Sequence, residues 1–254
     1  MISPWPHSLP PRRRPVLLFV LSCLMANLCP TIAHVASSLD QQVFLFFNRD
    51  HGLPWLDSGW AVLSSLDFWM PFLILTGVLI AWFGGFRGRA MLACLLLSIG
   101  LMEGCLINPL KDIIGRQRPS HVLPQARRVD LAQASPRLLA LAEPARVRPS
   151  KASAPRSRGN SLPSGHTSNM FCFATVLAIF YRWRGALFYI PASLVALSRI
   201  ATGSHWPSDI VLSAIMSVLV TYGLVALYRW IWHRWAPGIV PKLASRHPRL
   251  IPPQ

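Results

Sequence analysis

The chain has 254 residues, of which 52% are hydrophobic and only 13% are charged. Soluble domains average about 25% charged residues, so this deficit argues against an ordinary soluble protein and favours long apolar segments. The formal net charge is +16, but many basic residues flank or interrupt apolar runs, which argues against nucleic acid as a partner and favours anionic lipid or a phosphate-handling site.

Six apolar runs follow one another along the chain. Runs of about 17–25 apolar residues are typical of membrane-spanning helices. We expect spans over about residues 16–35, 60–83 (with a bend at Pro71), 90–110, 166–181, 186–201 and 207–228. The first run also resembles a cleavable signal peptide, but a six-helix bundle needs it, so we favour its retention. The pattern predicts an all-α polytopic membrane protein, a six-transmembrane-helix bundle.

Two segments lie outside these runs. Residues 120–160 are rich in Arg, Ala, Pro and Ser and contain no sustained apolar run, so we expect a flexible basic extramembrane loop between helices three and four. Residues 236–254 form a basic, Pro-containing tail. Because the length suits one bundle and no internal repeat is present, residues 1–254 are predicted to be a single membrane domain.

Three polar clusters stand at the ends of the predicted spans. They are residues 111–119, 163–166 and 198–209. Spans three and five leave the membrane on one face, and spans four and six re-enter from the same face. One pocket is therefore expected to collect Lys111, Arg118, Ser164, Gly165, His166, Arg199, His205 and Asp209.

A phosphoryl group explains this combination of residue types. Arg118 and Arg199 offer planar bidentate donors to its oxygens, and Lys111 adds a point charge. Ser164 and Gly165 are typical of a helix N-terminus, where a hydroxyl and free backbone N–H groups bind anions. These five residues are the predicted phosphate-binding set.

The two histidines have complementary predicted roles. His205 lies four positions before Asp209, which suits a nucleophile oriented by a carboxylate. His166 is then the general acid for the leaving alcohol and later the base for water. Because the cations take the electrostatic role of a metal, and no carboxylate cluster has metal-site spacing, we expect neither a metal nor another cofactor.

The clusters resemble the three signature motifs of the type 2 phosphatidic acid phosphatase superfamily. The motifs are Lys, six residues, Arg-Pro; then Pro-Ser-Gly-His; then Ser-Arg, five residues, His, three residues, Asp, and every position is matched between Lys111 and Asp209. The resemblance covers about residues 57–228. It implies a six-helix bundle, a periplasmic active site and a phosphohistidine at His205. It also implies lipid substrates such as phosphatidic acid, phosphatidylglycerol phosphate, lipid A or undecaprenyl pyrophosphate.

Two charged residues near the motifs are harder to interpret. Glu103 precedes Lys111 by eight residues, which places it about 12 Å lower on a helix, and we expect a structural role rather than phosphate chemistry. Arg116 occupies a free position of the first motif. An accessory phosphate contact and a structural role are equally compatible with it.

The sequence allows more than one function, and its basic residues give conflicting evidence on which side of the membrane the pocket faces. The predicted function is metal-independent hydrolysis of a lipid phosphate or pyrophosphate through a phosphohistidine. The alternatives are phosphoryl transfer to a second lipid and lipid binding without catalysis. The short basic turns place the pocket outside by the positive-inside rule, in the periplasm of a bacterial inner membrane. Residues 120–160 on the pocket side are equally basic, and we expect them to gather anionic lipid headgroups. The sequence makes no prediction of the oligomeric state.

Overall fold

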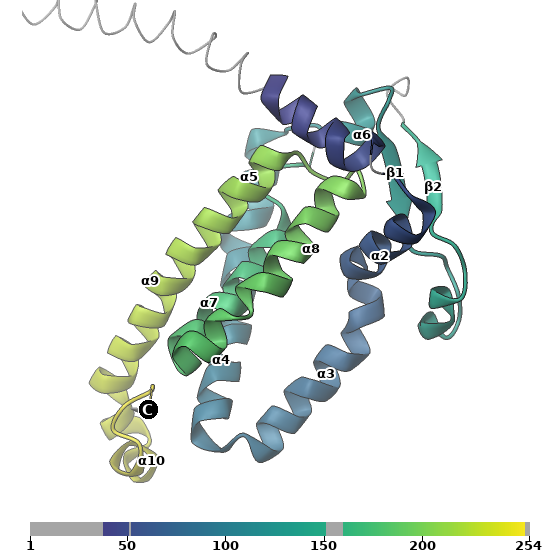
Figure 1. Cartoon of the computed structure of the whole chain (residues 1–254). Coiled ribbons are helices and arrows are strands. Elements are labelled where there is room, and N and C mark those ends of the chain that lie inside the picture. Colours follow the sequence, from purple (N-terminus) through teal and green to yellow (C-terminus); the bar gives the residue numbers. More distant parts are fainter. Residues whose placement is uncertain (1–37, 51, 151–159, 252–254) are drawn as a thin grey trace, which may run out of the picture. The chain divides into compact units, whose positions relative to one another are not determined.

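A computed structural model describes residues 38–50, 52–150 and 160–251. The chain divides into two units, residues 1–42 and 43–254. Of the first unit, residues 38–42 are described and are helical. The predicted span over residues 16–35 lies outside the described residues. The second unit is almost entirely helical and contains all the elements below (Figure 1).

The predicted second span is two helices. Helix α2 (Pro54–Ser64) ends where Ser65 adopts an extended backbone (φ −90°, ψ 98°), and helix α3 (Leu66–Phe83) follows. Pro71 lies inside α3 and does not end it, so the interruption within the predicted span falls at Ser65 and not at this proline. Only Phe68 of α3 is buried, and apolar side chains such as that of Trp82 (75% exposed) cover the helix. Such a surface is stable only in an apolar environment.

The third span is longer than predicted. Helix α4 (Gly85–Met102) continues through a π-helical turn, η2 (Glu103–Ile107), into helix α5 (Asn108–Ile114). Gly115 then ends the helix in the left-handed conformation (φ 60°), which a glycine adopts at little cost. This glycine lies within the first polar cluster, and the short helix α6 (Pro119–Val122) begins at the last residue of that cluster.

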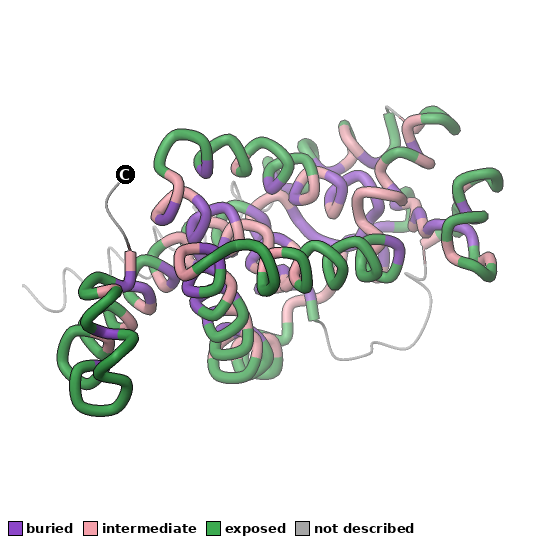
Figure 2. The backbone as a smooth tube through the Cα atoms, turned by 90° about the horizontal axis from the view of Figure 1, so that it is seen from below, coloured by how far each residue is buried: buried purple, intermediate pink, exposed green. Residues whose placement is uncertain are grey.

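Helix α7 (Gly165–Ala186) is the central helix of this unit. It packs against α4, against α8 (Tyr189–Ala201) and against α9 (Pro207–Ile239). Its buried side chains, among them Cys172 and Phe180, join those of α4 and α9 in the main apolar core. The buried stretches lie in the middle of the view in Figure 2, and the peripheral helices are largely exposed.

The described part of the chain contains fewer candidate spans than the six predicted. Helix α3, the stretch Gly85–Val122 and α9 are each long and apolar enough to cross a membrane. Helices α7 and α8 pass the same test only together, as a pair bent by 104°. Alone, the 13-residue α8 is about 20 Å long, less than the roughly 30 Å of a hydrocarbon core. Three or four spans are therefore described, as expected for an integral membrane protein.

Residues 120–150 are folded, which corrects the prediction of a flexible loop for this part of the segment. Strands β1 (Arg127–Asp130) and β2 (Arg146–Pro149) pair in an antiparallel hairpin, and a 3₁₀ turn, η3 (Arg137–Leu141), lies between them. An apolar cluster made of Ala61, Phe68, Val129, Leu131, Ala132 and Ala140 packs the hairpin against α2 and α3. The members of the cluster in this segment lie in short stretches separated by polar residues, so the sequence contains no long apolar run that predicts the cluster. Residues 151–159 lie outside the described residues.

Asn48 and Arg127 attach the hairpin to the connection between α8 and α9. The buried Asn48 amide donates to the carbonyl oxygens of Arg127 (2.9 Å) and Ala201 (2.7 Å), and its oxygen accepts from the Arg127 N–H (2.7 Å). The Arg127 guanidinium also forms an ion pair with Asp57 (2.9 Å). At Gly203 (φ 76°) a Cβ atom would collide with the Arg127 carbonyl oxygen. The hairpin therefore has a fixed position beside this connection.

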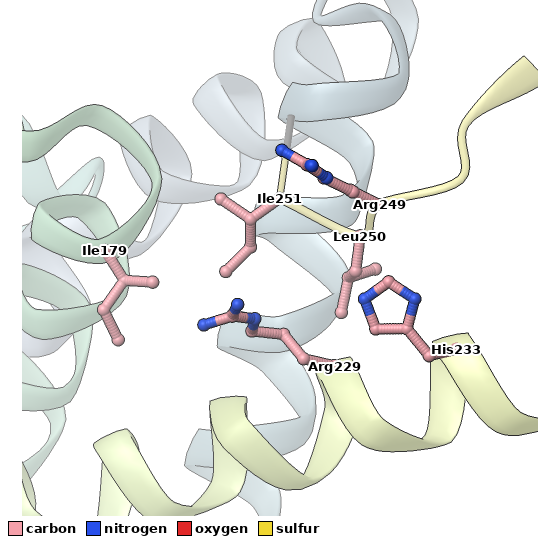
Figure 3. A pocket seen from close by; sticks show the side chains of 6 residues that line it. All are labelled: Ile179, Arg229, His233, Arg249, Leu250 and Ile251. Carbon is pink, nitrogen blue, oxygen red and sulfur yellow. The ribbon is translucent and has the colours of Figure 1, made fainter. Parts of the chain in front are cut away.

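The predicted C-terminal tail is partly helical and packed. Helix α9 extends to Ile239, and α10 (Pro241–Arg246) follows it at the end of α9 remote from the hairpin (Figure 1). Leu250 is only 8% exposed and joins the main apolar core. A pocket of about 270 Å³ lies at this end, and its polar lining side chains are Arg229, His233 and Arg249 (Figure 3).

Candidate active site

The three polar clusters of the sequence lie together at one end of the bundle. The His205 ring contacts residue 161, just before the second cluster, and Trp206 Nε1 donates to the Gln117 carbonyl oxygen (2.8 Å). Arg116 of the first cluster forms an ion pair with Asp209 of the third (2.6 Å). The folded chain therefore brings the three segments into contact, as the order of the predicted spans leads us to expect.

His205 is held rigidly in the connection between α8 and α9. Its side chain is buried, at 3% exposed, and its backbone N–H donates to the Arg199 carbonyl oxygen (3.1 Å). Nδ1 lies 2.6 Å from the Ser161 carbonyl oxygen. Because a carbonyl oxygen only accepts, Nδ1 carries the proton, and Nε2 is left with its lone pair.

The electrostatic surroundings keep this imidazole neutral. Burial lowers the pKa of His205 well below its usual 6.5, and the charges of Arg199 and Arg118 lower the pKa further. The Ser161 carbonyl opposes this effect without overcoming it. At neutral pH the ring is therefore uncharged, with Nε2 unprotonated.

Asp209 does not orient His205 in the way that the sequence suggested. Its nearest oxygen is 3.9 Å from His205 Nδ1, beyond hydrogen-bond distance. Oδ2 instead accepts from the Ser161 hydroxyl and from the Trp206 N–H (2.9 Å), and Oδ1 accepts from Arg116 Nη1 (2.6 Å). The carboxylate thus holds the residue whose carbonyl contacts His205. Arg116 has a structural partner here, one of the two roles left open for it.

The start of α9 explains why Asp209 is buried at this position. Trp206 is the N-cap residue and Pro207 the first helical residue, where a missing N–H costs nothing. Asp209 is then the third helical residue, and its side chain accepts from the N-cap N–H, as acidic residues commonly do at this position. This local geometry follows directly from the sequence.

Ser164 caps the N-terminus of α7. Its Oγ accepts from the Thr167 N–H (3.5 Å) and from the Thr167 hydroxyl (3.0 Å), and its own N–H donates to Ser213 Oγ (2.8 Å). The side chain is fully buried. Gly165 and His166 are the first two residues of the helix, so their backbone N–H groups are among those that a helix leaves free for an anion.

His166 and Arg199 line a cavity of about 400 Å³. Arg199 Nη1 donates to the Ser64 carbonyl oxygen (3.3 Å) and hydroxyl, and its buried Nε has no protein partner. Lys111 and Arg118 do not line this cavity. Lys111 nevertheless lies beside the start of α7, because a Cβ atom built on Gly165 would be 3.6 Å from its Nζ.

Glu103 lies at the level of the site, not 12 Å below it. A Cβ atom built on Gly165 would be 3.2 Å from Glu103 Oε1, and the same oxygen accepts from Asn169 Nδ2 (2.9 Å). The π-helical turn η2 holds more residues than an α-turn, so Glu103 and Lys111 return to one face of the helix. The long Lys111 side chain also leans back toward the helix N-terminus, which brings its ammonium down toward Glu103.

Several residues of the site were absent from the sequence prediction. Ser161 acts through its backbone carbonyl, which every residue type has, so no sequence signal exists for it. Ser64 lies in another helix and contacts Arg199 only in the folded chain. For Glu103 a signal was present, since a carboxylate within an apolar run is unusual.

Comparison with known proteins places these features in a family. The family model of the PAP2 superfamily matches residues 91–235. The chain is 25% identical over 185 residues to a lipid A 4′-phosphatase of Bacteroides thetaiotaomicron, covering 71% of this chain and 72% of that protein. It is 38% identical over 65 residues to a lipid A 1-phosphatase of Porphyromonas gingivalis, which covers 24% of this chain but only 15% of that relative's length.

Solved structures agree on the fold. The crystal structure of Aquifex aeolicus LpxE is similar with a TM-score of 0.51 and 22% identity, over 74% of this chain and 95% of that one. A transmembrane PAP2-type phosphatidylglycerolphosphate phosphatase from Bacillus subtilis is similar with a TM-score of 0.50 and 21% identity, over 87% and 98% of the two chains. Because the family model covers more than half of the sequence and includes all three motifs, the chain belongs to the PAP2 superfamily.

Proposed function

We propose that the chain is an integral-membrane phosphatase that hydrolyses a lipid phosphate or diphosphate, with His205 as the nucleophile. The observation that carries the proposal is the hydrogen bond from His205 Nδ1 to the Ser161 carbonyl (2.6 Å). A buried imidazole with its proton fixed on Nδ1 has a free lone pair on Nε2, as nucleophilic catalysis requires.

The first step forms a covalent phosphoryl-enzyme. His205 Nε2 attacks phosphorus, an N–P bond forms, and the bond between phosphorus and the leaving oxygen breaks. His166, as its conjugate acid, gives a proton to that oxygen, so a lipid alcohol leaves neutral and a lipid monophosphate leaves with one negative charge fewer. Its place in the lining of the cavity supports contact with the leaving oxygen of a phosphate ester bound there.

The second step restores the enzyme. His166 is neutral after the first step and takes a proton from water while the water oxygen attacks phosphorus. The N–P bond breaks, inorganic phosphate leaves, and the His205 lone pair is regenerated. Each proton that His166 gives is therefore returned by the water that completes the cycle.

Charge on the phosphoryl oxygens is balanced by protein cations in this mechanism. Arg199, Arg118 and Lys111 supply the positive charge, and the helix start at Ser164 and Gly165 supplies N–H donors. The backbone N–H of His205 donates to the Arg199 carbonyl oxygen (3.1 Å), which supports the closeness of these two residues. We propose that neither a metal nor another cofactor takes part.

The relatives support a lipid substrate. Lipid A phosphatases are among the proteins that this chain resembles, and a putative undecaprenyl-diphosphatase of Escherichia coli is 39% identical over 51 residues. Phosphoryl transfer from His205 to a second lipid uses the same site and is the first alternative. Lipid binding without catalysis is the second, and the complete set of motif residues argues against it.

We further propose a single phosphatase domain with six membrane helices, in a bacterial inner membrane with the site facing the periplasm. Arg229 and Arg249 lie at the end of the unit remote from the hairpin, in the pocket of Figure 3, and the short turns with Arg87 and Arg184 are also basic. In the structure Arg87 lies in the first turn of α4 and Arg184 in the last turn of α7, so both belong to helix ends. By the positive-inside rule a basic end of this kind is cytoplasmic, which supports the orientation.

His205→Ala provides the test. Purified wild-type protein should release inorganic phosphate from a lipid phosphate or diphosphate, and labelled substrate should leave an acid-labile phosphoryl group on the protein. His205→Ala should do neither while remaining folded and inserted in the membrane. His233→Ala is the matched control, because this histidine lies in the remote pocket of Figure 3. Normal turnover by His205→Ala would refute the mechanism. Lipid product with less than one free phosphate per turnover, in the presence of an acceptor lipid, would establish the transferase alternative.

A further inference from the structure

We propose that the arginines of the β1–β2 hairpin region form a second anion site beside the catalytic cavity, and that this site binds a second phosphate group of the substrate. The site rests on the proposed function and narrows it to lipids that carry two phosphates. The shared chemistry is a second phosphate, whether it is joined to the first as a diphosphate or carried elsewhere on a glycolipid.

One continuous cavity of about 400 Å³ joins the two groups of residues. The catalytic His166 and Arg199 line it together with Arg128, Arg137 and Arg148. Arg128 and Arg148 are directly opposite each other across the hairpin, so their side chains project to the same face. The volume falls within the range of about 300–1,000 Å³ that is typical of small-molecule sites.

The lining of the cavity keeps an excess of positive charge. Four arginines face two carboxylates, those of Asp67 and Asp130. Asp130 pairs with both Arg128 (3.3 Å) and Arg148, so one carboxylate is shared between two guanidinium groups. A phosphate group that enters such a site meets donors that are only partly compensated.

Arg137 supplies the third guanidinium. Its Nη1 donates to the Ala132 carbonyl oxygen (2.6 Å) and its Nη2 to Ser65 Oγ (3.4 Å), which holds the group at the junction of α2 and α3. Its buried Nε has no protein partner. A buried donor without a partner is costly, and an anion in the cavity would relieve this cost.

The hairpin is placed rigidly enough to act as part of a binding site. Val129 N–H donates to the Thr202 carbonyl oxygen (3.2 Å), three residues before His205, and the Asn48 side chain joins β1 to the end of α8. The backbone that carries the arginines is therefore fixed relative to the nucleophile before substrate arrives. Preorganisation of this kind increases affinity because little ordering remains to be done on binding.

The test compares two lipids that differ by one phosphate, phosphatidic acid and diacylglycerol diphosphate with the same acyl chains, in neutral detergent micelles. Arg148→Gln should raise the KM for the diphosphate about tenfold, as expected when one charge-assisted hydrogen bond is removed, with kcat unchanged. The KM for the monophosphate should change by less than about twofold. Arg146→Gln is the matched control, because Arg146 lies in the same strand but does not line the cavity.

Two further experiments identify where the second phosphate lies on the substrate and control for misfolding of the variants. In a second experiment, a disaccharide lipid with two separate phosphates is compared with the same lipid carrying one phosphate. If Arg148→Gln raises the KM only for the two-phosphate member of either pair, the result supports the site. Arg137→Gln, with its melting temperature checked, should repeat the selective effect. An equal rise in KM for both members of each pair would overturn the inference, since it indicates general attraction of anionic lipid. No turnover of any lipid by the wild type would instead refute the proposed function itself.

Discussion

Replacement of Asp209 by Asn tests whether this carboxylate acts through its neighbours. Asp209 is fully buried and accepts from Arg116 (2.6 Å), from the Trp206 N–H (2.9 Å) and from the Ser161 hydroxyl, but it is 3.9 Å from His205 Nδ1. The amide of Asp209→Asn keeps one accepting oxygen and loses the charge. Its main effect should therefore be to loosen residue 161 and Arg116.

The magnitude follows from the hydrogen bonds that the substitution weakens. A hydrogen bond to a charged group contributes about 1.5–3 kcal/mol, and each 1.36 kcal/mol is a factor of about ten in rate. Because the Arg116 side chain is 30% exposed and water partly replaces its partner, we expect values toward the lower end. Asp209→Asn and Arg116→Gln should each reduce kcat/KM by about 10- to 100-fold, with the Ser161–His205 hydrogen bond retained.

A double-mutant cycle on a lipid phosphate in micelles is the assay, with melting temperatures recorded for each variant. If Asp209 and Arg116 act as one unit, the double variant should be scarcely slower than the slower single variant. Losses that multiply would refute this reasoning, because the two residues would then contribute independently. A loss in Asp209→Asn as complete as that in His205→Ala would show that the carboxylate acts on the imidazole directly.

Four further outcomes are expected. The pKa of His205 is well below 6.5 in the folded protein, so the acid limb of the pH profile of kcat/KM should lie well below pH 6.5. The free energy of unfolding should decrease as pH falls below about 6.5, because the unfolded chain then binds a proton that the folded chain does not. An acid limb near 6.5 would contradict the buried neutral imidazole. Glu103→Gln removes a negative charge beside Lys111 and should tighten inhibition by inorganic phosphate about three- to tenfold, whereas weaker inhibition would mean that Glu103 chiefly positions Lys111. Asn48→Ala leaves buried carbonyl and N–H groups of two segments without partners, which should cost about 2–5 kcal/mol and be visible as a lower melting temperature; an unchanged value would show that the hairpin does not depend on this contact. Activity should survive chelation by EDTA, and loss of activity that Mg²⁺ restores would contradict the metal-free mechanism.

Local rules were sufficient for much of the site. Pro207 and Asp209 mark the start of α9, and Ser164 caps α7, because caps and first turns depend on residues within a few positions of one another. The order of the apolar runs was also enough to bring the three polar clusters to one end of the bundle. The spacing of the motifs alone indicates the family, and the family match over residues 91–235 confirms it.

Contacts between distant segments decided the rest. The hairpin is held by Asn48, 79 positions from Arg127, and by single apolar residues that form a cluster only when α2, α3 and the hairpin meet. Glu103 reaches the site because a π-helical turn changes which residues share a helix face, a change that no simple periodicity contains.

The partner of His205 shows the same limit most clearly. The sequence predicts that Asp209 is the partner of His205. The atom that fixes the tautomer of His205 is instead the carbonyl oxygen of residue 161, which is 44 positions away. The chemistry of a side chain can be inferred from the residue type, whereas every residue has a backbone carbonyl. Which carbonyl faces the imidazole is therefore determined by the packing of α7 against α9, and only the tertiary structure reveals it.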